Sequence, residues 1–464
     1  MSEQTEPTDS GTGPSLPVAA VVVDTPLAHL DRVFEYTVPE ELRDAAVPGA
    51  RVRVRFSGRE LDGFVIERRA EPEHGGRLSA LRRVVSPEPV LTPQLLALCR
   101  AVADRYAGTL SDVLRLAIPK RHATAERNLP LDPDSPATAE TGAPATAETG
   151  APATAETGAP AESSGSVESP ASAYSADSAV RPRVEDRDLG PWADYPAGPA
   201  WLRRVTAGEG PAAAWLALPS RLPGDDWPHA FARAAAAALD GGRGAVLVVP
   251  DHRDVDRLDT ALTELLGRGQ HVRLTADQGP QARYTAWLKV LRGHVRVAIG
   301  TRAAAFAPVR DLGLVAWWDD GDDLLLEPRA PYPHTGTVLQ LRAAQTGAAV
   351  LAGGYARSLA VQQAIERGGL VAVEAEPALL RAAAPRVTIA GEGADEERDG
   401  PAARAHLPSR AWRVAKDALH DGPVLVQVPR RGYLPSLSCA ECRTPVRCVR
   451  CHGPVAVTAA GSTP

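Results

Sequence analysis

The sequence predicts a multidomain α/β protein, and three observations lead to that class. A β-rich pattern runs from about residue 16 to 122, a low-complexity stretch follows it, and apolar runs alternate with helical stretches from about residue 191. The 464 residues suffice for roughly three domains. Apolar residues make up 44% and charged residues 23%, which is typical of a soluble globular protein.

Composition and charge exclude several classes of protein. No apolar run approaches the length that a membrane span requires, and the polar N-terminus lacks the features of a signal peptide. We therefore expect a cytoplasmic protein without a membrane partner. The net charge of −6 argues against a polycation that coats nucleic acid, although a local basic patch can still bind phosphates.

Residues 16–122 form the first predicted domain. Apolar runs and period-two alternation predict strands at Val18–Val23, Val33–Val38, Ala50–Phe56 and Phe64–Ile66. In the third strand Val52 and Val54 alternate with Arg51, Arg53 and Arg55, so one face is buried and the other is basic. Helical spacing follows at Leu95–Tyr106 and Leu110–Leu116. The expectation is a small β-rich module closed by helices, with Cys99 in its core.

The predicted linker, residues 123–190, contains the octad ATAETGAP three times in tandem from Ala137 to Pro160. Such a segment has too few large apolar side chains to form a core, which predicts disorder.

Residues 191–390 read as a parallel-sheet lobe. Continuous apolar runs predict strands at Gly244–Pro250, Val295–Gly300, Leu312–Trp318 and Ala348–Ala352, and an Ala-rich helix at Ala230–Leu239. Apolar strands separated by helices are typical of a parallel sheet that helices cover on both faces. Residues 391–464 are predicted to begin a second lobe, with a first strand at Pro423–Val428.

Four of the five cysteines lie in the last segment, as Cys439-x-x-Cys442 and Cys448-x-x-Cys451. Two such pairs in a cytoplasmic chain indicate zinc, because two thiolates on one tight turn reach a single tetrahedral ion. Five residues separate the pairs, which is short for a ribbon around one ion. Either the four close one cramped site, or each pair is half of a different site, so we expect one or two Zn²⁺ ions.

Four segments resemble the PriA family of replication restart proteins. Pro429–Pro435 (PRRGYLP) is similar to the segment that leads into that family's zinc module. Arg32–Tyr36 (RVFEY) and Gly49–Phe56 (GARVRVRF) resemble two elements of its DNA-binding domain, and Val297–Pro308 resembles part of its first helicase lobe, which has a RecA-like fold. The sequence lacks a segment that corresponds to the family's winged helix, and it is rich in Ala and Arg. In both respects it resembles the helicase-inactive branch of the family, which occurs in high-GC Gram-positive bacteria.

The resemblance implies a pocket for the 3′ end of a DNA strand, built from Phe34, Glu35, Tyr36, Gly58 and Arg82. An aromatic ring can stack on the terminal base, Glu35 can accept a hydrogen bond from the 3′ hydroxyl, and Arg82 can neutralise a phosphate. The alternatives are that Phe34 and Tyr36 are core residues of a strand and that the face of Arg51, Arg53 and Arg55 is merely solvated.

When the sequence is aligned with the family on these segments, the ATPase motifs of the family are not found at their expected positions. A P-loop needs Gly-Lys-Ser/Thr, but residues 216–226 read LALPSRLPGDD. Trp318-Asp319-Asp320-Gly321 stands where the family has its Walker B motif, and Gly353-Gly354-Tyr355 replaces a third motif. We therefore expect no ATP binding or hydrolysis and no catalytic residues. The run of Asp319, Asp320, Asp322 and Asp323 also suggests a metal or nuclease site, but a solvated loop is commoner.

Together these features predict a replication-restart protein that recognises branched or stalled-fork DNA. It would promote loading of the replicative helicase, with the helicase, its loader and single-stranded DNA-binding protein as partners, near the nucleoid and without unwinding DNA. The alternatives are an active 3′-to-5′ helicase with divergent motifs and a zinc-stabilised scaffold that contacts only proteins.

Overall fold

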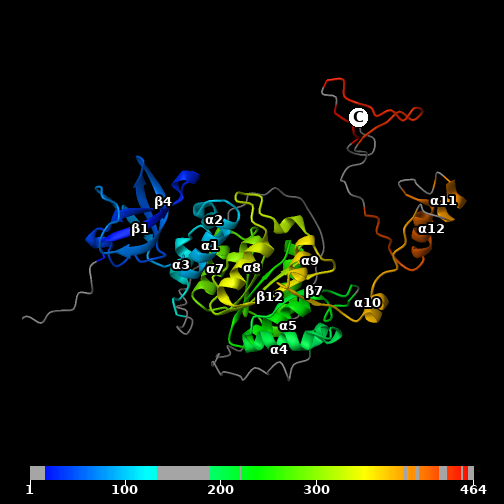
Figure 1. Cartoon of the computed structure of the whole chain (residues 1–464), viewed down its shortest axis with the longest axis horizontal. Coiled ribbons are helices and arrows are strands. Elements are labelled where there is room, and N and C mark those ends of the chain that lie inside the picture. Colours follow the sequence, from blue (N-terminus) through cyan, green and yellow to red (C-terminus); the bar gives the residue numbers. More distant parts are fainter. Residues whose placement is uncertain are drawn as a thin grey trace, which may run out of the picture. The chain divides into compact units, whose positions relative to one another are not determined.

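The computed structural model describes residues 16–132, 189–219, 221–390, 394–400, 402, 407–427, 436–450 and 453–457. The chain divides into a first unit, residues 1–384, and a second, residues 385–464. The octad repeats and the segment Pro429–Pro435 lie outside the described residues. Figure 1 shows the β-rich part, the sheet-containing lobe and the C-terminal segments in chain order.

The first unit begins with a six-stranded sheet of order β5-β2-β1-β4-β3-β6. Its strands are β1 (Val18–Val23), β2 (Val33–Thr37), β3 (Arg51–Phe56), β4 (Arg59–Arg69), β5 (Ser79–Ala80) and β6 (Arg83–Ser86). Val52 and Val54 of β3 are fully buried while the arginines between them are not, as the period-two pattern predicts. The four predicted strands are thereby confirmed.

The sheet closes on itself through the two residues between β5 and β6. The amide of Leu81 donates to Thr37 O of β2 (2.9 Å), and the next amide, of Arg82, donates to Arg53 O of β3 (3.0 Å). Because these strands lie toward opposite ends of the sheet order, the pair of bonds joins its two sides. The result is a small barrel without a long open edge, which leaves few strand groups free to pair with another chain.

Three helices follow the barrel: α1 (Pro93–Arg105), α2 (Leu110–Ala117) and α3 (Ala123–Asn128). The hydroxyls of Thr92 and Thr109 cap α1 and α2 at their first turns. The apolar faces of these helices share one core with the lobe, in which Cys99 is fully buried. Instead of closing the β-rich module alone, as expected, the helices therefore join the barrel to the lobe.

The start of the predicted linker is also ordered structure. Residues 123–132 include α3, whose Ala125 is buried, and this helix packs on α7 (Pro280–Leu291). The carbonyls of Glu126, Leu129 and Pro130 accept hydrogen bonds from Arg292. Placing these residues in the disordered segment was wrong. Their low hydrophobicity suggested disorder, but hydrogen bonds from the distant Arg292 hold them in place.

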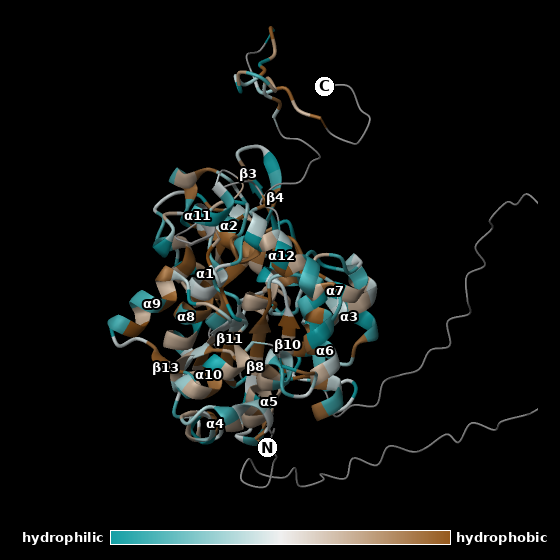
Figure 2. Cartoon of the chain, turned by 90° about the vertical axis from the view of Figure 1, so that its right-hand side faces the viewer, coloured by the Kyte–Doolittle hydropathy of each residue, from teal (hydrophilic) through white to brown (hydrophobic). Residues whose placement is uncertain are grey.

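The lobe is a seven-stranded parallel sheet of order β13-β7-β12-β11-β8-β10-β9, typical of a RecA-like lobe. Its strands are β7 (Ala212–Leu216), β8 (Gly244–Val248), β9 (His271–Leu274), β10 (Val297–Gly300), β11 (Leu312–Trp318), β12 (Ala349–Gly354) and β13 (Val371–Val373). Figure 2 shows hydrophobic residues on β8, β10 and β11 in the interior between the helices. The predicted strands coincide with β8, β10, β11 and β12 because buried parallel strands are continuously apolar.

Helices cover both faces of this sheet. Besides α7 they are α4 (Gly198–Ala207), α5 (Trp227–Asp240), α6 (His252–Leu266), α8 (Thr335–Thr346), α9 (Leu359–Glu366) and α10 (Pro377–Ala383). Short 3₁₀ turns are η1 (Ala28–Leu30), η2 (Glu40–Leu42), η4 (Gly190–Asp194), η5 (Arg302–Phe306) and η6 (Asp323–Leu325).

The described part of the second unit contains α11 (Ala394–Asp399), α12 (Ser409–Ala418) and the cysteine-bearing turns. The strand expected at Pro423–Val428 is not formed over residues 423–427, where Leu425 is 92% exposed. An apolar run becomes a strand only beside another strand, and no described segment pairs with this one.

Candidate functional site

The predicted 3′-end pocket lies on the barrel, where Phe34, Glu35 and Tyr36 are consecutive residues of β2. Phe34 and Tyr36 pair with Val21 and Ala19 and contact the barrel core, whereas Glu35 points to the opposite face. Tyr36 is 3% exposed, and burial raises the pKa of its hydroxyl to about 12. Tyr36 is therefore a core residue in this structure, as the alternative interpretation proposed.

Phe34 is only half-buried, and its ring is held from two sides. The Phe56 ring meets it edge-on at 4.7 Å between centroids, and the Arg32 guanidinium lies 5.1 Å from its centroid. An aromatic ring that is positioned by its neighbours and still accessible can stack on a base, and a guanidinium beside it can contact a phosphate. Arg32 and Phe56 were missed as site residues, although both lie in segments that carry the resemblance.

The carboxylate of Glu35 already accepts three hydrogen bonds. Its donors are the amides of Glu73 (3.1 Å) and His74 (2.9 Å) and the Arg69 guanidinium (3.0 Å). The two amides, together with Arg69, hold the pKa of Glu35 below its usual value. Glu35 therefore fixes the turn after β4, and its role as an acceptor for a 3′ hydroxyl stays a prediction.

Gly58 and Arg82 lie at two separate turns of the barrel. Ser57 and Gly58 both have positive φ (47° and 80°) in the two-residue turn between β3 and β4, which explains a glycine there. Nothing lies within 4 Å of a Cβ built on Gly58, so this turn is open. Arg82 is exposed at the closure of the barrel, and neither the buried Tyr36 nor Glu35, on the opposite face of β2, lies on the accessible part of the Phe34 ring.

A second candidate site is the edge of the lobe's sheet where β7, β11 and β12 end. The amides of Ala217 and Asp319 donate to Gly354 O (2.9 Å) and Gly353 O (2.8 Å), so the residues after the three strands meet. Carboxyl ends of parallel strands are the usual ligand-binding edge of an α/β sheet. The three degenerate motifs found in the sequence therefore converge at one place.

Residues 217–226, of which Ser220 is outside the described residues, take the position of a phosphate loop between β7 and α5. Asp226 is the residue before α5 and interacts with His229 Nδ1 (2.5 Å) and Arg257 Nη2 (3.3 Å). His229 also reaches Glu264 (3.1 Å), and although burial opposes it, the two carboxylates raise the His229 pKa. A carboxylate thus stands at a helix N-terminus, where a nucleotide site would place phosphate.

Aromatic side chains fill the same edge. Trp227 stacks on Trp318 at 4.5 Å with an interplanar angle of 11°, and Arg257 lies 5.1 Å over Trp227. Tyr355, in the third degenerate motif, meets Trp318 edge-on at 5.0 Å. These rings occupy the junction of the three motifs, and Trp227 and Trp318 are almost fully buried.

The aspartates beside the rings have structural partners. Asp320 accepts hydrogen bonds from Trp317 Nε1 (2.6 Å) and from Ser358, and His334 lies 4.0 Å away. Burial and the neighbouring Asp322 and Asp320 raise the pKa of Asp319. Within the described part of the chain, no group of three or more His, Cys, Asp or Glu side chains is arranged to hold a metal ion.

The third candidate is the cysteine-bearing segment, of which Cys439, Cys442 and Cys448 are described and Cys451 is not. In the first turn the Cys439 amide donates to Thr444 O (2.9 Å), and Cys442 Sγ lies 3.2 Å from Thr444 Oγ1. Hydrogen bonds with Thr444 and Cys439 lower the Cys442 pKa to about 7. The thiolate that zinc needs is therefore favoured there, so the residue type and its surroundings fit a zinc ligand.

The two cysteine turns repeat one another after nine residues. The Cys448 amide donates to Gly453 O (2.9 Å), as that of Cys439 does to Thr444 O, and the bridge Ser438–Pro445 recurs as Arg447–Pro454. This repeat was not predicted, although the sequence carries its signal: Pro-Val follows each cysteine pair at the same distance, in Pro445-Val446 and Pro454-Val455.

No described helix is both long and apolar enough to cross a membrane.

Known proteins resemble this chain both in the barrel domain and over most of its length. Residues 20–119 match the sequence model of the PriA 3′DNA-binding domain (3′BD). The chain is 45% identical over 94% of its length to a probable replication restart protein PriA of Mycobacterium tuberculosis, and 45% identical over 92% to that of Mycobacterium leprae. A replication restart protein PriA of Treponema pallidum is 24% identical over 95% of the chain.

The chain spans 59% of the length of the two mycobacterial relatives. The matched domain covers β1 to β6, α1 and α2, and therefore includes Phe34 with both of its neighbours. By its sequence, the chain is therefore similar over most of its length to replication restart proteins PriA, and residues 20–119 are similar to that family's 3′DNA-binding domain.

Proposed function

We propose that this chain recognises the 3′ end of a DNA strand at a branched or stalled replication fork and promotes loading of the replicative helicase there. One observation carries the proposal. In the domain matched to the 3′DNA-binding model, Phe34 is accessible and is oriented by Phe56 and Arg32. A positioned ring beside a cation suits a terminal nucleotide, which offers a base to stack and a phosphate to neutralise.

The chain performs this role without unwinding DNA, so we propose that it is not an enzyme. Three features of the sheet edge support that step. Asp226 stands at the N-terminus of α5, Trp227 and Trp318 fill the junction, and Asp319 and Asp320 add negative charge. A triphosphate needs donors and positive charge at such an edge, so we expect no ATP to bind.

Zinc completes the proposal, with Cys439, Cys442, Cys448 and Cys451 as the ligands of one or two ions. Its chemistry is structural, because tetrahedral thiolate sites stabilise short segments that bury little apolar surface. The nine-residue repeat supports two equivalent half-sites, since each turn presents its first cysteine in the same backbone setting.

The partners that we propose are forked DNA, the replicative helicase or its loader, and single-stranded DNA-binding protein, in the cytoplasm near the nucleoid. Their support is the name of the relatives, which are replication restart proteins.

Fluorescence anisotropy with labelled forks tests the proposal, using leading strands that end in a 3′ hydroxyl or a 3′ phosphate, with and without ATP–Mg²⁺. We expect tight binding that prefers the hydroxyl and is unaffected by ATP. Binding that is blind to the 3′ end would overturn the recognition step and favour a scaffold that contacts only proteins. ATP-dependent strand separation in a parallel assay would instead identify an active helicase.

A further inference from the structure

Two adjoining cavities of the first unit lie between the barrel, α2 and the lobe, away from Phe34. Their volumes are about 780 and 510 Å³. The first lies against β3, β4, β6 and α2, and the second against the end of α2, the start of α7 and η5. Both are lined by Arg115, Leu116, Ile118, Lys120 and Arg329, so they form one continuous depression, which we call the α2–α7 groove.

The groove is strongly basic. Seven Lys and Arg side chains line the first cavity and two more line the second, against three carboxylates in the first and one in the second. Each carboxylate already has an arginine: Asp24 and Asp112 bind Arg115 (2.6 and 2.8 Å), Asp62 binds Arg53 (2.8 Å), and Glu327 binds Arg302 (3.3 Å). The acidic side chains of the groove are therefore neutralised by only part of its positive charge.

Four groove cations have no carboxylate within 4.0 Å among the described residues: Arg51, Arg83, Lys120 and Arg283. The fifth cation, Arg329, lies 4.0 Å from Glu327, a carboxylate that Arg302 also binds, and its side chain is 80% exposed. These five cations come from four parts of the chain, namely β3, β6, the segment after α2, and the lobe. Residues so far apart in sequence converge here only because α2 packs on the lobe.

Two of these cations are costly to leave without an anion. Burial lowers the pKa of Arg283, and the nearby positive charge of Arg329 lowers it further. Burial also lowers the pKa of Arg51, whose Nη2 donates to Pro119 O (2.6 Å) while its guanidinium covers the Phe64 ring at 5.1 Å. A half-buried cation favours an anion beside it, and at Arg283 an anion would relieve both the burial and the repulsion from Arg329.

The start of α7 adds to this preference. Gly279 precedes the helix without a side-chain cap, and the first residues of α7 are exposed at the rim of the groove. The positive end of the helix dipole therefore supports the same sign of ligand.

We propose that the α2–α7 groove binds the phosphate backbone of DNA, as a second binding surface beyond the 3′-end pocket. Phosphates spaced along one chain match cations spread over a groove, and such interactions position a duplex or strand without reading its sequence. The proposal rests on the proposed function only in choosing DNA as the phosphate source. The charge and geometry of the α2–α7 groove are independent of Phe34.

The test compares two triple variants of the full chain with equal change in charge. R83A/K120A/R329A removes three exposed groove cations, and R203A/R268A/R367A removes three exposed arginines that line neither cavity. Affinity for fork DNA is measured by anisotropy from 50 to 300 mM salt. We expect the groove variant to bind on the order of tenfold more weakly, and the salt slope to fall by about 0.9 for each duplex phosphate that is no longer neutralised.

Three comparisons decide the outcome. The control triple and the charge-conserving R83K/K120R/R329K should bind as the unaltered chain does, and equal losses in both alanine triples would overturn the proposal. Inorganic tripolyphosphate is the probe for free phosphate: if it binds through the groove while DNA affinity is unchanged, DNA is the wrong ligand. The ratio of affinities for 3′-hydroxyl and 3′-phosphate ends should be unchanged in the groove variant. If the affinity of the unaltered chain did not depend on the 3′ end but was lowered by the groove substitutions, the proposed function would be contradicted and the groove proposal would stand.

Discussion

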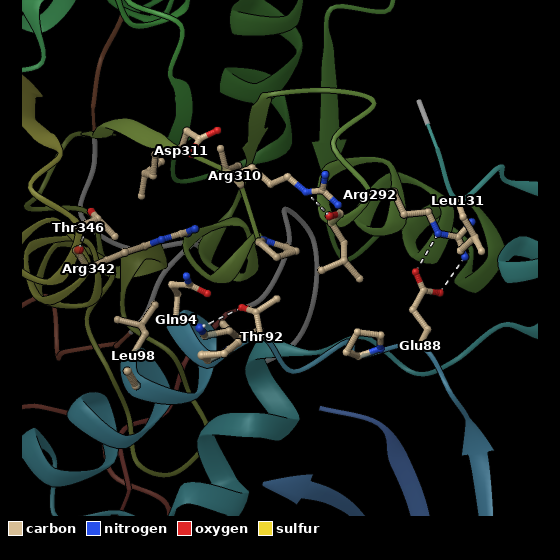
Figure 3. Close-up of a pocket in the computed structure, with 18 of the residues that line it drawn as sticks. Glu88, Thr92, Gln94, Leu98, Leu131, Arg292, Arg310, Asp311, Arg342 and Thr346 are labelled. Carbon is tan, nitrogen blue, oxygen red and sulfur yellow. Dashed lines mark hydrogen bonds and ion pairs between the residues drawn. The ribbon is translucent and has the colours of Figure 1, made fainter. Parts of the chain in front are cut away.

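Arg292, at the end of α7, holds Glu88, in the segment after β6, through two parallel hydrogen bonds. Its Nε and Nη2 lie 2.8 and 2.7 Å from the two carboxylate oxygens, and both side chains are almost completely buried (4% and 10% exposed). Figure 3 shows the two residues facing one another at one side of a cavity of about 1590 Å³. The fork geometry is among the strongest that a guanidinium and a carboxylate form, so this pair fastens the barrel segment to the lobe.

We predict that Arg292→Met destabilises the first unit by about 3–5 kcal/mol, because it leaves the buried Glu88 charge without its partner. The double variant R292M/E88L should recover part of that loss, since neither charge then remains buried. Urea unfolding followed by circular dichroism measures both effects. If the single and double variants were equally unstable, the hydrogen bonds that Arg292 donates to the carbonyls of Glu126, Leu129 and Pro130 would be responsible and not its ion pair.

Phe34→Ala should weaken binding to fork DNA by about 1–3 kcal/mol, the usual contribution of one aromatic ring that stacks on a base. The loss should be confined to forks with a free 3′ end. Tyr36→Phe keeps the buried ring and Trp412→Ala removes an exposed ring from the second unit, and neither should change the anisotropy titration. A uniform loss on all forks would assign Phe34 to folding of the barrel.

Acid should loosen the turn that Glu35 holds. The Glu35 pKa is lowered in the folded protein by the Glu73 and His74 amides and by Arg69. Its contribution is therefore complete above the unfolded-state pKa, which is about 4.3, and is lost as the pH falls through the folded value. Hydrogen exchange of the Glu73 and His74 amides from pH 6 to 3 measures this opening. In Glu35→Gln the pH dependence should disappear, and its persistence there would point to another carboxyl group.

Removing zinc should unfold the cysteine-bearing segment and leave the first unit intact. Structural zinc supplies the folding free energy of small sites, and the turns around Cys439 and Cys448 bury little apolar surface. We expect one or two zinc ions per chain by elemental analysis, and a chelator should remove them together with the amide protection of residues 436–457. Cys99→Ser is the matched control, because Cys99 lies in the core of the first unit. A metal-free chain with the same protection would contradict a structural zinc site.

Local pattern was sufficient for eight of the described strands and for α1, α2 and α5, but not for other described elements such as β7 and β9. The alternation of Val52 and Val54 with arginines predicts β3, and the apolar runs predict β8, β10, β11 and β12, because burial on one or both faces imposes these patterns on a strand. The same reasoning failed at Leu425, where an apolar run has no neighbouring strand in the described part of the chain and lies exposed.

The candidate sites divide in the same way. Residue type and spacing indicated the cysteine pairs and the missing P-loop, whereas Phe34 was singled out only by the resemblance to the PriA family. Strand alternation predicts that Phe34 and Glu35 lie on opposite faces of the strand. It does not predict which side chains contact each of them. The partners of Glu35 are Arg69, at the end of β4, and His74, in the turn after it, both distant along the chain.

The sequence by itself determined the resemblance to the PriA family, the positions of eight of the described strands and of α1, α2 and α5, and which chemical groups are present. Only the tertiary structure decided that α1, α2 and α3 pack on the lobe, that Arg292 meets Glu88, and that the cations from Arg51 to Arg329 line one groove. The reason is physical: local patterns record whether a side chain is buried, whereas its partners depend on packing between segments that are far apart along the chain.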